Sequence, residues 1–524
     1  MRVWKKALLI LRTVVHLRPR QMWFQVYYRL YKPTLPLPCS TDAVMAAADG
    51  HWHTLPLSKY RCWEGGLTFR FLNVADGFSS WNDVRHGMLW AYNLNYMDWL
   101  MQDGISLTDG QNWMERFMDE MPENRVGLDP YPIALRGLNW IKFITLHPEL
   151  DAPTRARWNA ALRRQYRLLE RKMEYHLLGN HLLEDAFSCF VAALYFSDAG
   201  MYTRASGLLL RQLREQILPD GAHYEQSAMY HCILLDRLLD CYNFSMANQR
   251  FDGQPAVQKA LHACAVRMLG HLESIAYADG TIPLFNDAAN SIAPTVGALR
   301  DYARRLGLAW QPVPLKECGY RRLQHGALDA VVDVGDITAT YQPGHTHADT
   351  FSYELRMMGR PIVVDTGIST YDKTPRRQYE RGTCAHNTVS VDGHDSSEVW
   401  GGFRVGRRAQ IKIQTDNAPQ YVQAEHNGFG KTCRRTFSMR DQSFQVTDQV
   451  ATLAESFIHL APSESVEYAS PEEVLTTHAR ISISPDAAVR IADDAVATEY
   501  NSLHPSKVII ITFRNCMTYS ISMR

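Results

Sequence analysis

The sequence predicts an α+β protein in which a helical domain is followed by an antiparallel β domain. Between about residues 80 and 305, apolar residues recur three and four positions apart, as on one face of a helix. Beyond residue 320 they mostly alternate with polar residues, as in half-buried strands. The length of 524 residues also exceeds what one hydrophobic core usually accommodates, so more than one domain is expected.

The helical region is expected to pack as hairpins. Segments such as "TRARWNAALRRQYRLLERKMEYHLL" and "SAMYHCILLDRLLDCYNFSMA" carry the helical period with few Pro or Gly residues. They recur without a strict sequence repeat, so a solenoid of identical units is not indicated. A helical bundle or an α/α toroid over residues 76–310 is predicted, preceded by a basic helical extension over residues 1–75.

A linker rich in Pro and Gly separates the two regions. It lies within "LAWQPVPLKECGYRRL", residues 308–323. Short β-branched or alternating runs follow it, among them "PIVVDTG", "AQIKIQ" and "KVIIITF", and turn residues separate them. These runs predict a sandwich-like antiparallel domain over residues 320–524.

Composition and motifs exclude several classes of function. Lys plus Arg and Asp plus Glu number 55 each, so no global charge favours binding to nucleic acid. The sequence contains no Walker loop, no Rossmann fingerprint and no GxSxG motif. No pair of carboxylates stands out as the acid and base of a glycosidase. The ten cysteines are scattered without a CxxC pair, which favours free thiols over a disulfide framework.

The N-terminus, "MRVWKKALLILRTVVHLRPRQ", combines basic residues with an apolar patch that Arg12 and His16 interrupt. No small-residue cleavage site follows, so the segment matches a secretory signal poorly, and it is too short and too charged to span a bilayer. A helix docked on the protein and a basic amphipathic helix on a membrane surface are both compatible with it. The compartment stays open between the cytoplasm and the cell envelope, with the periplasm as an alternative.

The stretch "PGHTHADTFSYEL", residues 343–355, places His345, His347 and Asp349 on one face if it is extended. Further along, Asp365 ends the run "PIVVDTG" and His386 lies in "RGTCAHNTVSVDG". Two imidazoles and one carboxylate suit zinc, so His347, Asp365 and His386 are a candidate ligand set. A hydrogen-bonded network of the same side chains without metal is the alternative.

The helical region carries polar motifs at its turns. "GNHLLEDA" holds Asn180 and His181, "ILPDGAHYEQSAMYH" holds Glu225 and Tyr230, and "DGTIPLFND" is a third. Each can be structural: Asn180 as a helix N-cap, Tyr230 as packing at an interface. Together they suggest a lined cleft. Asn, Tyr and His side chains suit proton abstraction better than nucleophilic attack.

These motifs, in this order along residues 80 to 410, resemble the heparinase II/III-like superfamily of polysaccharide lyases, which includes heparinases and alginate lyases. The match rests on "GNHLLEDA", "ILPDGAHYEQSAMYH", "DGTIPLFND", "HTHADTFSYELRMMGRPIVVDTG" and "RGTCAHNTVSVDG". The resemblance implies an incomplete α/α toroid joined to an antiparallel β-sandwich, with the substrate cleft between them. It also implies cleavage of a uronic-acid polysaccharide by β-elimination, which leaves unsaturated uronate ends.

The resemblance assigns roles to individual residues. Asn180, with His181, would hold the uronic carboxylate, Tyr230 would be the catalytic acid or both acid and base, and His345 the second base or neutralising group. Structural zinc would be held by His347, Asp365 and His386. The expected contacts with substrate, or the residues supporting them, are Arg136, Glu225, Tyr371 and Arg381.

The predicted partner is therefore an anionic polysaccharide, with peripheral membrane contact through the basic N-terminus as a further expectation and nucleic acid excluded. The natural role could be degradation or processing during capsule or exopolysaccharide assembly. A component of such a pathway that binds or processes glycan without lyase activity is the alternative. Product analysis distinguishes them, because a lyase leaves a double bond and a binding protein leaves the polymer intact.

Overall fold

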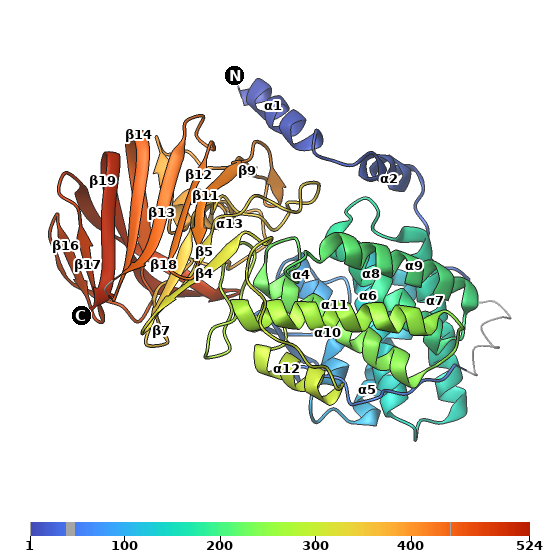
Figure 1. The fold of residues 1–524 in the computed structure, drawn as a ribbon. Helices are drawn as coiled ribbons and strands as arrows, with labels where there is room; N and C mark the ends of the chain where they lie inside the picture. The colour runs from blue at the N-terminus through green and yellow to red at the C-terminus, as the bar shows by residue number, and fades with distance from the viewer. Residues whose placement is uncertain (1, 38–47, 441) are drawn as a thin grey trace.

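The structure, a computed structural model, describes residues 2–37, 48–440 and 442–524. A helical domain occupies the first half of the chain and a domain of antiparallel sheets occupies the second, side by side (Figure 1). The predicted fold class, an incomplete α/α toroid followed by an antiparallel β-sandwich, is confirmed.

The toroid alternates buried helices with amphipathic ones. Nearly all residues of α6, α8 and α10 are buried, whereas α5, α7 and α9 keep one polar face. Side chains at the N-caps of α5, α7, α9, α10 and α12 accept hydrogen bonds from the first turn, which fixes where these helices begin. The described helices of the domain are α4 (Met88–Tyr96), α5 (Leu107–Glu120), α6 (Pro130–Leu146), α7 (Ala152–Lys172), α8 (Gly179–Tyr195), α9 (Ala199–Gln216), α10 (Ala228–Ala247), α11 (Gln254–Ile275) and α12 (Val296–Arg305).

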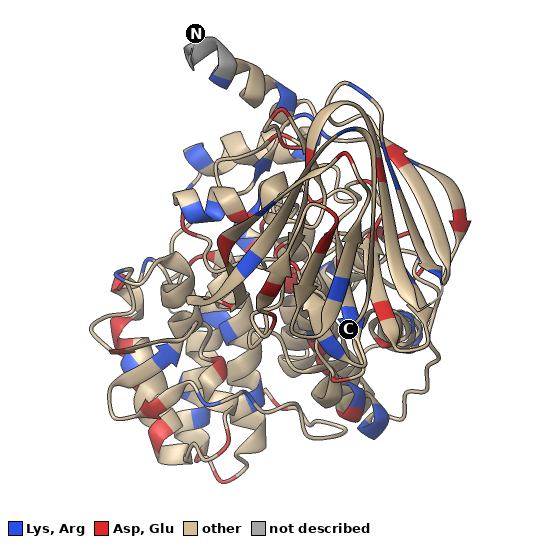
Figure 2. Cartoon of the chain, turned by 90° about the vertical axis from the view of Figure 1, so that its left-hand side faces the viewer, with Lys and Arg blue, Asp and Glu red and all other residues tan. Residues whose placement is uncertain are grey.

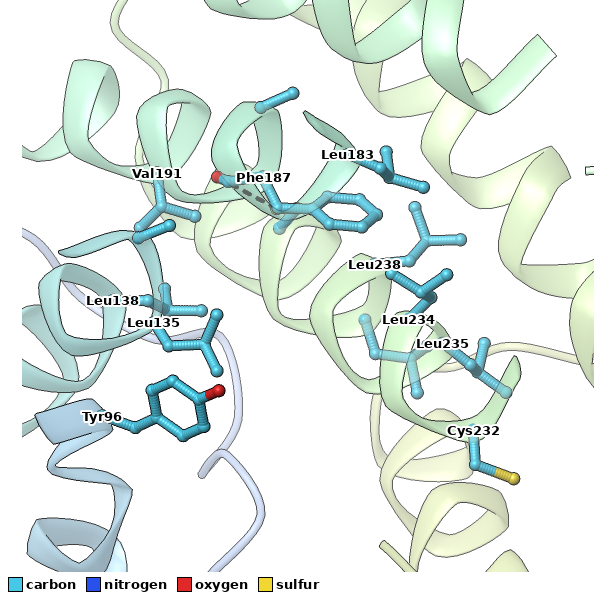
Figure 3. Packing of buried hydrophobic residues seen from close by; sticks show 14 of the residues in the cluster. Tyr96, Leu135, Leu138, Leu183, Phe187, Val191, Cys232, Leu234, Leu235 and Leu238 are labelled. Carbon is cyan, nitrogen blue, oxygen red and sulfur yellow. Dashed lines mark hydrogen bonds between the residues drawn. The ribbon is translucent and has the colours of Figure 1, made fainter. Parts of the chain in front are cut away.

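The core of the toroid lies between the inner helices (Figure 3). Leu138 of α6 faces Phe187 and Val191 of α8, and Leu235 and Leu238 of α10 complete the contact surface. All five side chains are fully or almost fully buried. Burial of such a side chain stabilises the fold by roughly 1.5–3 kcal/mol. This packing makes α8 and α10 a rigid base for the polar residues at their N-terminal ends.

A small sheet precedes the toroid. It consists of β1 (Trp63–Gly65), β2 (Thr68–Phe71) and β3 (Val74–Gly77) in sequential antiparallel order. Phe69 and Phe71 point from β2 into the aromatic core, where Phe69 meets Trp99 and Trp113 edge to face.

The β domain has two main sheets and a two-stranded sheet of β9 (Val399–Trp400) and β10 (Arg404–Val405). The smaller sheet has the order β4-β5-β6-β7, and the larger has the order β11-β12-β13-β14-β19-β17-β16-β15, with β18 paired to β19 and β8 to β14. Their inner faces form a second apolar core, with Val332 and Leu355 on one side and Val446 and Ile511 on the other. The strands of the two main sheets are β4 (Tyr320–His325), β5 (Leu328–Asp333), β6 (Tyr353–Met357), β7 (Arg360–Val363), β8 (Val389–Val391), β11 (Ile411–Asn417), β12 (Tyr421–His426), β13 (Cys433–Arg440), β14 (Ser443–His459), β15 (Val466–Ala469), β16 (Glu473–Thr476), β17 (Ala479–Ile483), β18 (Ala488–Glu499) and β19 (Ser502–Met523).

Two N-terminal helices, α1 (Arg2–Val14) and α2 (Pro19–Leu30), lie outside both cores (Figure 1). Arg12 of α1 forms an ion pair with Glu398, on the side of the β domain. The hydroxyl of Tyr28 in α2 donates to the carbonyl of Met173, on the side of the toroid. None of the described helices is both long enough and apolar enough to cross a membrane.

Candidate active site

The residues predicted for catalysis meet where the two domains adjoin. The side-chain amide nitrogen of Asn180, at the start of α8, lies 3.4 Å from Nε2 of His345, in the segment before β6. The ring of Tyr230, in the first turn of α10, lies 4.0 Å from the ring of His345, measured between centroids. Two inner helices of the toroid and one loop of the β domain therefore supply three groups around one position.

Asp287 and Arg377 hold His345 in place. Nδ1 of His345 lies 2.9 Å from one carboxylate oxygen of Asp287, and Arg377 donates to both oxygens of that carboxylate at 2.5 and 2.7 Å. Burial would raise the pKa of Asp287, but Arg377 and the histidines outweigh it and hold the pKa well below its ordinary value. A charged Asp287 accepts the Nδ1 proton, so Nε2 of His345 carries the lone pair and can act as a base.

The hydroxyl of Tyr230 belongs to a pair of tyrosines. It lies 3.1 Å from the hydroxyl of Tyr371, which in turn lies 3.4 Å from Nδ1 of His345. The ring of Tyr371 meets that of Tyr500 at a right angle, with 5.3 Å between centroids. Burial raises the pKa of Tyr230 and of Tyr371, so both hydroxyls stay protonated at neutral pH. Tyr230 is thus suited to donate a proton.

Glu225 orients Asn180. Its carboxylate accepts hydrogen bonds from the backbone nitrogen of Asn180 at 2.9 Å and from the side-chain nitrogen at 2.8 Å. Gly179 makes this approach possible: its φ is +61°, and a Cβ there would lie 2.6 Å from Glu225 Oε1. Asn180 is not the N-cap of α8, which is Leu178. One amide proton of Asn180 is held by Glu225, and the other faces Nε2 of His345 at 3.4 Å.

His181, the next residue, lies on the partly exposed side of α8. Its Nδ1 is 3.0 Å from Glu174, and its side chain is 28% exposed. Burial would lower the pKa of His181, but Glu174 outweighs it and raises the pKa above the ordinary value. Its ring packs against Tyr131 at 4.7 Å. His181 therefore favours the positively charged form more than a free imidazole does, and it is the residue next to Asn180.

Three loops of the site pass through left-handed backbone conformations at residues other than glycine. Leu178, Gln226 and Asn286 have φ of 64°, 59° and 59°, and each lies within two residues of a polar residue of the site. Such conformations cost about 1–3 kcal/mol and persist where the surroundings impose them. Here the side chain of Asn286 joins two of the loops, because it accepts from the amide of His347 and donates to the carbonyl of Gln226.

Two arginines predicted to contact substrate are internal supports, which corrects that expectation. The guanidinium of Arg136 is fully buried in the toroid, where it donates to Gln165 and to the carbonyls of Asn95 and Gly127. Arg381 is also fully buried and donates twice to the carbonyl of Thr346, so it fixes the backbone between the two histidines. Burial lowers the pKa of each to about 9. Neither side chain is accessible to a polymer.

The sequence interpretation did not assign a role to Asp287 or to Arg377. Asp287 ends the motif "DGTIPLFND", so its position at a polar turn was visible although its partners were not. Arg377 lies in the short helix α13 (Pro375–Glu380), and nothing in its local sequence separates it from a surface arginine. Its complete burial against Asp287 comes from the tertiary fold.

The predicted zinc ligands lie behind His345. Nδ1 of His347 and Nε2 of His386 are buried and have no hydrogen-bond partner, while their other ring nitrogens are held by Asp287 and Asp365 at 2.7 Å. One buried oxygen of Asp349 is also unpartnered. Two free imidazole nitrogens with carboxylates beside them fit the chemistry of zinc. The ligand atoms of this predicted set are not gathered around one point. Among the described residues, the group whose three ligand atoms all lie within 4.8 Å of one another is a different one, Asp220, His271 and Cys318.

A cavity of about 570 Å³ adjoins the site. Ile233, one turn beyond Tyr230, and Tyr500, whose ring meets that of Tyr371, both line it, whereas Asn180, Tyr230 and His345 do not. Its volume is in the range of small-molecule sites. Two lysines in the wall of the cavity already form ion pairs, Lys59 with Asp98 and Lys142 with Asp240. The cavity has residues of both domains in its wall, as expected of a cleft between them.

Comparisons with known proteins agree with this architecture. A heparin-sulfate lyase from Bacteroides thetaiotaomicron is 23% identical over 297 residues, which are 48% of this chain and 41% of that relative. Two solved structures of heparinase III superpose with TM-scores of 0.64 and 0.66 at 14% and 13% identity, covering 85% and 95% of this chain and 80% and 88% of theirs. A heparan sulfate lyase from Pedobacter heparinus gives 0.58 at 16% identity, over 96% of this chain and 87% of its own.

Family models match both domains. The heparinase II/III N-terminus matches residues 156–304, and the heparinase II/III-like C-terminal domain matches residues 309–523. The two matches follow each other in the order of the toroid and the β-sandwich, and they include every residue that meets at the site. The chain therefore belongs to the heparinase II/III-like family.

Proposed function

We propose that the protein is a polysaccharide lyase that cleaves a uronic-acid polymer by β-elimination. The observation that carries the proposal is the arrangement around His345, whose Nε2 lies beside the Asn180 amide and whose ring lies against Tyr230. Relatives named heparin-sulfate lyase and heparinase III support the same class of reaction.

The reaction needs a base, an acid and a group that stabilises negative charge. A base removes the proton on the carbon next to the uronic carboxylate, a double bond forms, and the bond to the 4-oxygen breaks. The leaving oxygen takes a proton from an acid. Because abstraction adds negative charge to the carboxylate, the step is slow unless donors are aimed at that group.

The residues of the site divide these tasks. His345 removes the proton through Nε2, with its tautomer set by Asp287. Tyr230 protonates the leaving oxygen, because burial keeps its hydroxyl protonated. Asn180 would turn its second amide proton, which faces Nε2 of His345, to the uronic carboxylate, and His181 would add a positive charge beside it. A donor aimed in this way contributes roughly 2.7–4 kcal/mol.

His347, Asp365 and His386 would hold zinc in a structural role, with Asp349 adjacent as a further oxygen donor. When bound, the ion would supply positive charge and rigidity behind the segment that carries His345. The unpartnered nitrogens of His347 and His386 are the support for this assignment. Asp287 would fix the ring of His347 through its other nitrogen, whereas Asp365, which lies 2.7 Å from Nδ1 of His386, would have to leave that contact to bind the ion.

The substrate class is an anionic polysaccharide with uronic acid units, such as a glycosaminoglycan, an alginate-like polymer or an exopolysaccharide handled during surface-polysaccharide assembly. A glycan-binding role without chemistry is less well supported. A buried Arg377–Asp287 pair that orients an imidazole has no purpose in simple binding, whereas a base requires it.

The N-terminal helices would place the enzyme on an anionic membrane surface. Residues 1–40 contain eight Lys or Arg and no Asp or Glu, although the whole chain has no net charge. Figure 2 shows only basic colour on the first helix. Leu8 and Leu11 of α1, Val15 just after it, and Trp23 and Leu30 of α2 are exposed, the last two at 66% and 83%. Exposed apolar residues flanked by basic residues are suited to bind the surface of a membrane that contains anionic lipid.

A panel of polymers tests the enzymatic proposal. Heparan sulfate, chondroitin sulfate, hyaluronate, alginate and a neutral glucan would each be incubated with the protein, and ultraviolet absorbance of the conjugated uronate would be followed. We expect absorbance and shorter chains with at least one uronate polymer, and none with the glucan. Cleavage without absorbance would indicate a hydrolase. Binding of a uronate polymer with no cleavage would support the glycan-binding alternative.

A further inference from the structure

A second group of metal-ligating side chains lies away from the active site, where the toroid joins the β domain. It consists of Asp220, in the turn after α9, His271, near the end of α11, and Cys318, in the linker just before β4. One ligand atom from each lies within 4.8 Å of the other two. The three residues are 5%, 3% and 0% exposed. Three segments distant in sequence thus bring a carboxylate, an imidazole and a thiol together in the interior.

The backbone around Asp220 is built for this approach. Gly221 has φ of +82°, and a Cβ there would lie 2.1 Å from the carbonyl oxygen of Arg267. Only glycine lets the turn press so closely against α11, the helix that carries His271. On its other side, Asp220 Oδ2 accepts hydrogen bonds from the amides of Lys316 and Cys318, at 3.0 and 2.9 Å. The carboxylate therefore already holds the linker next to α11.

The polar atoms of the group are incompletely satisfied. Nδ1 of His271 is buried without a hydrogen-bond partner. Burial lowers the pKa of His271 to about 4, so the ring is neutral and has a lone pair to offer. Burial would raise the pKa of Asp220, but hydrogen bonds from Cys318 and the neighbouring amides outweigh it and keep the pKa below its ordinary value. The partners of this carboxylate are the backbone amides of Lys316, Cys318 and Ala222, and no Lys or Arg of the described chain forms an ion pair with it. Such a charge is costly without a cation.

We propose that Asp220, His271 and Cys318 form a binding site for a zinc-like divalent cation. A carboxylate, a neutral imidazole nitrogen and a thiolate sulfur are zinc ligands, and the mixed set with sulfur excludes Mg²⁺ and Ca²⁺. Binding would release the Cys318 proton to solvent, and the two negative ligands would then balance the +2 charge. Ligand atoms around tetrahedral zinc lie roughly 3–4 Å apart, so closure by about 1 Å suffices. Water would occupy the fourth position.

The site would clip the interdomain linker to the toroid. Residues 306–319 lack regular structure, and they contact α11 elsewhere through Val313, whose amide donates to the carbonyl of Gly270. A cation at Asp220, His271 and Cys318 would add a second and stronger attachment directly before β4. Because it binds the folded junction and not the unfolded chain, it would raise the melting temperature as its concentration rises.

Cobalt substitution tests the proposal, since Co²⁺ bound to a thiolate gives a near-ultraviolet charge-transfer absorption that nitrogen and oxygen ligands do not give. The full chain would be stripped with chelator and titrated with Co²⁺. We expect the absorption in the wild-type protein and in His386→Ala, and its loss in Cys318→Ser. Cys264→Ser, a buried cysteine in α11 outside the group, serves as the control and should keep it.

The outcome is decisive without any activity measurement. Absence of the thiolate absorption in wild-type protein that has bound Co²⁺ overturns the proposal, as does its persistence in Cys318→Ser. If Cys318→Ser fails to fold, His271→Ala is used in its place. That variant keeps the thiol and the hydrogen bonds that Asp220 accepts from the amides of Lys316 and Cys318. That variant should bind Co²⁺ at least tenfold more weakly at this site, and unchanged affinity contradicts the assignment. Failure of the lyase proposal would not affect these spectra.

Discussion

The rings of His345 and Tyr230 lie 4.0 Å apart with their planes at 34°, although one belongs to the β domain and the other to the toroid. Asn180, on a third element, approaches the same imidazole. None of the three elements can build the site alone. The active site is therefore a product of the domain interface, and its geometry depends on the supports that hold each element against the others.

The first prediction concerns the tautomer of His345. Asp287→Asn removes the charge that accepts the Nδ1 proton, so the base nitrogen is no longer reliably unprotonated. We expect kcat to fall by about 10²–10⁴-fold, close to the loss in His345→Ala. The rate of formation of unsaturated ends on the best polymer of the panel measures it.

Asp301→Asn is the matched control, because Asp301 is on the surface and pairs with Arg304. It should keep the wild-type rate. Since Asp287→Asn also leaves Arg377 buried without its partner, circular dichroism must show that the variant is folded at the assay temperature. A folded Asp287→Asn protein with wild-type kcat would rule out His345 as a base oriented by Asp287.

The second prediction uses two glycines with similar backbone conformations. Gly179 and Gly66 have φ of +61° and +56°, but only at Gly179 would a Cβ meet another side chain, Glu225. Gly179→Ala should displace Glu225 and release Asn180, lowering kcat/KM by at least tenfold. Gly66→Ala carries the same backbone strain, about 1 kcal/mol, and should lose stability without losing activity. Equal activities in the two folded variants would show that the Glu225–Asn180 contact is dispensable.

Much of this site could be predicted from sequence, and the reason is local. Asn180, Tyr230 and His345 lie in turn-bounded polar motifs, where the residue types themselves indicate proton chemistry. The order of helical and strand periods similarly predicted the two domains. What the sequence did not reveal is which charged residues are buried.

Arg136, Arg377 and Arg381 illustrate that limit. All three are fully buried. Arg377 meets the Asp287 carboxylate and supports the base, whereas the other two donate chiefly to backbone carbonyls and hold loops. Their environments are created by segments remote in sequence, so no local pattern distinguishes a guanidinium that faces a polymer from one that faces a carbonyl.

The third prediction concerns pH. In the folded protein the pKa of His181 is raised above its ordinary value of 6.5. The stabilising positive charge is therefore fully present below pH 6.5 and is lost as the pH rises through the raised pKa. If the imidazolium attracts the uronic carboxylate, KM should increase as the pH rises above about 6.5 and through the raised pKa, and stability should decrease over the same range.

His181→Gln should have a higher KM at pH 6 and a KM that changes little with pH, with kcat much less affected. Initial rates across polymer concentrations at each pH give both constants. If His181→Gln keeps the full pH dependence of KM, the titrating group is a different one.

The fourth prediction concerns the zinc set behind His345. His386→Ala removes one of the two unpartnered imidazole nitrogens, so the purified protein should contain one equivalent of zinc less than wild type by elemental analysis. Its melting temperature should fall, and the thiolate absorption of the cobalt form should not change. His394→Ala, an exposed histidine nearby, is the control. Equal zinc contents in the two variants would remove His386 from the ligand set.

The fifth prediction concerns the N-terminal helices. Leu11 of α1 and Trp23 of α2 are each 66% exposed. Burial of such a side chain in lipid is worth roughly 1.5–3 kcal/mol, so Leu11→Glu with Trp23→Glu should weaken vesicle binding by at least tenfold. Co-sedimentation with phosphatidylglycerol vesicles measures it. Wild-type binding should weaken with salt and be much lower on neutral phosphatidylcholine.

Leu453→Glu provides the matched control, because Leu453 is an apolar residue of β14 that is 47% exposed and lies far from α1 in sequence. It should bind vesicles as wild type does while carrying the same chemical change. Sedimentation velocity on the same proteins tests whether a second copy of the chain, and not a membrane, covers the exposed apolar residues of α1 and α2. A dimer that Leu11→Glu with Trp23→Glu dissociates, together with no vesicle binding by wild type, would assign the apolar faces to a second copy of the chain and refute the membrane surface.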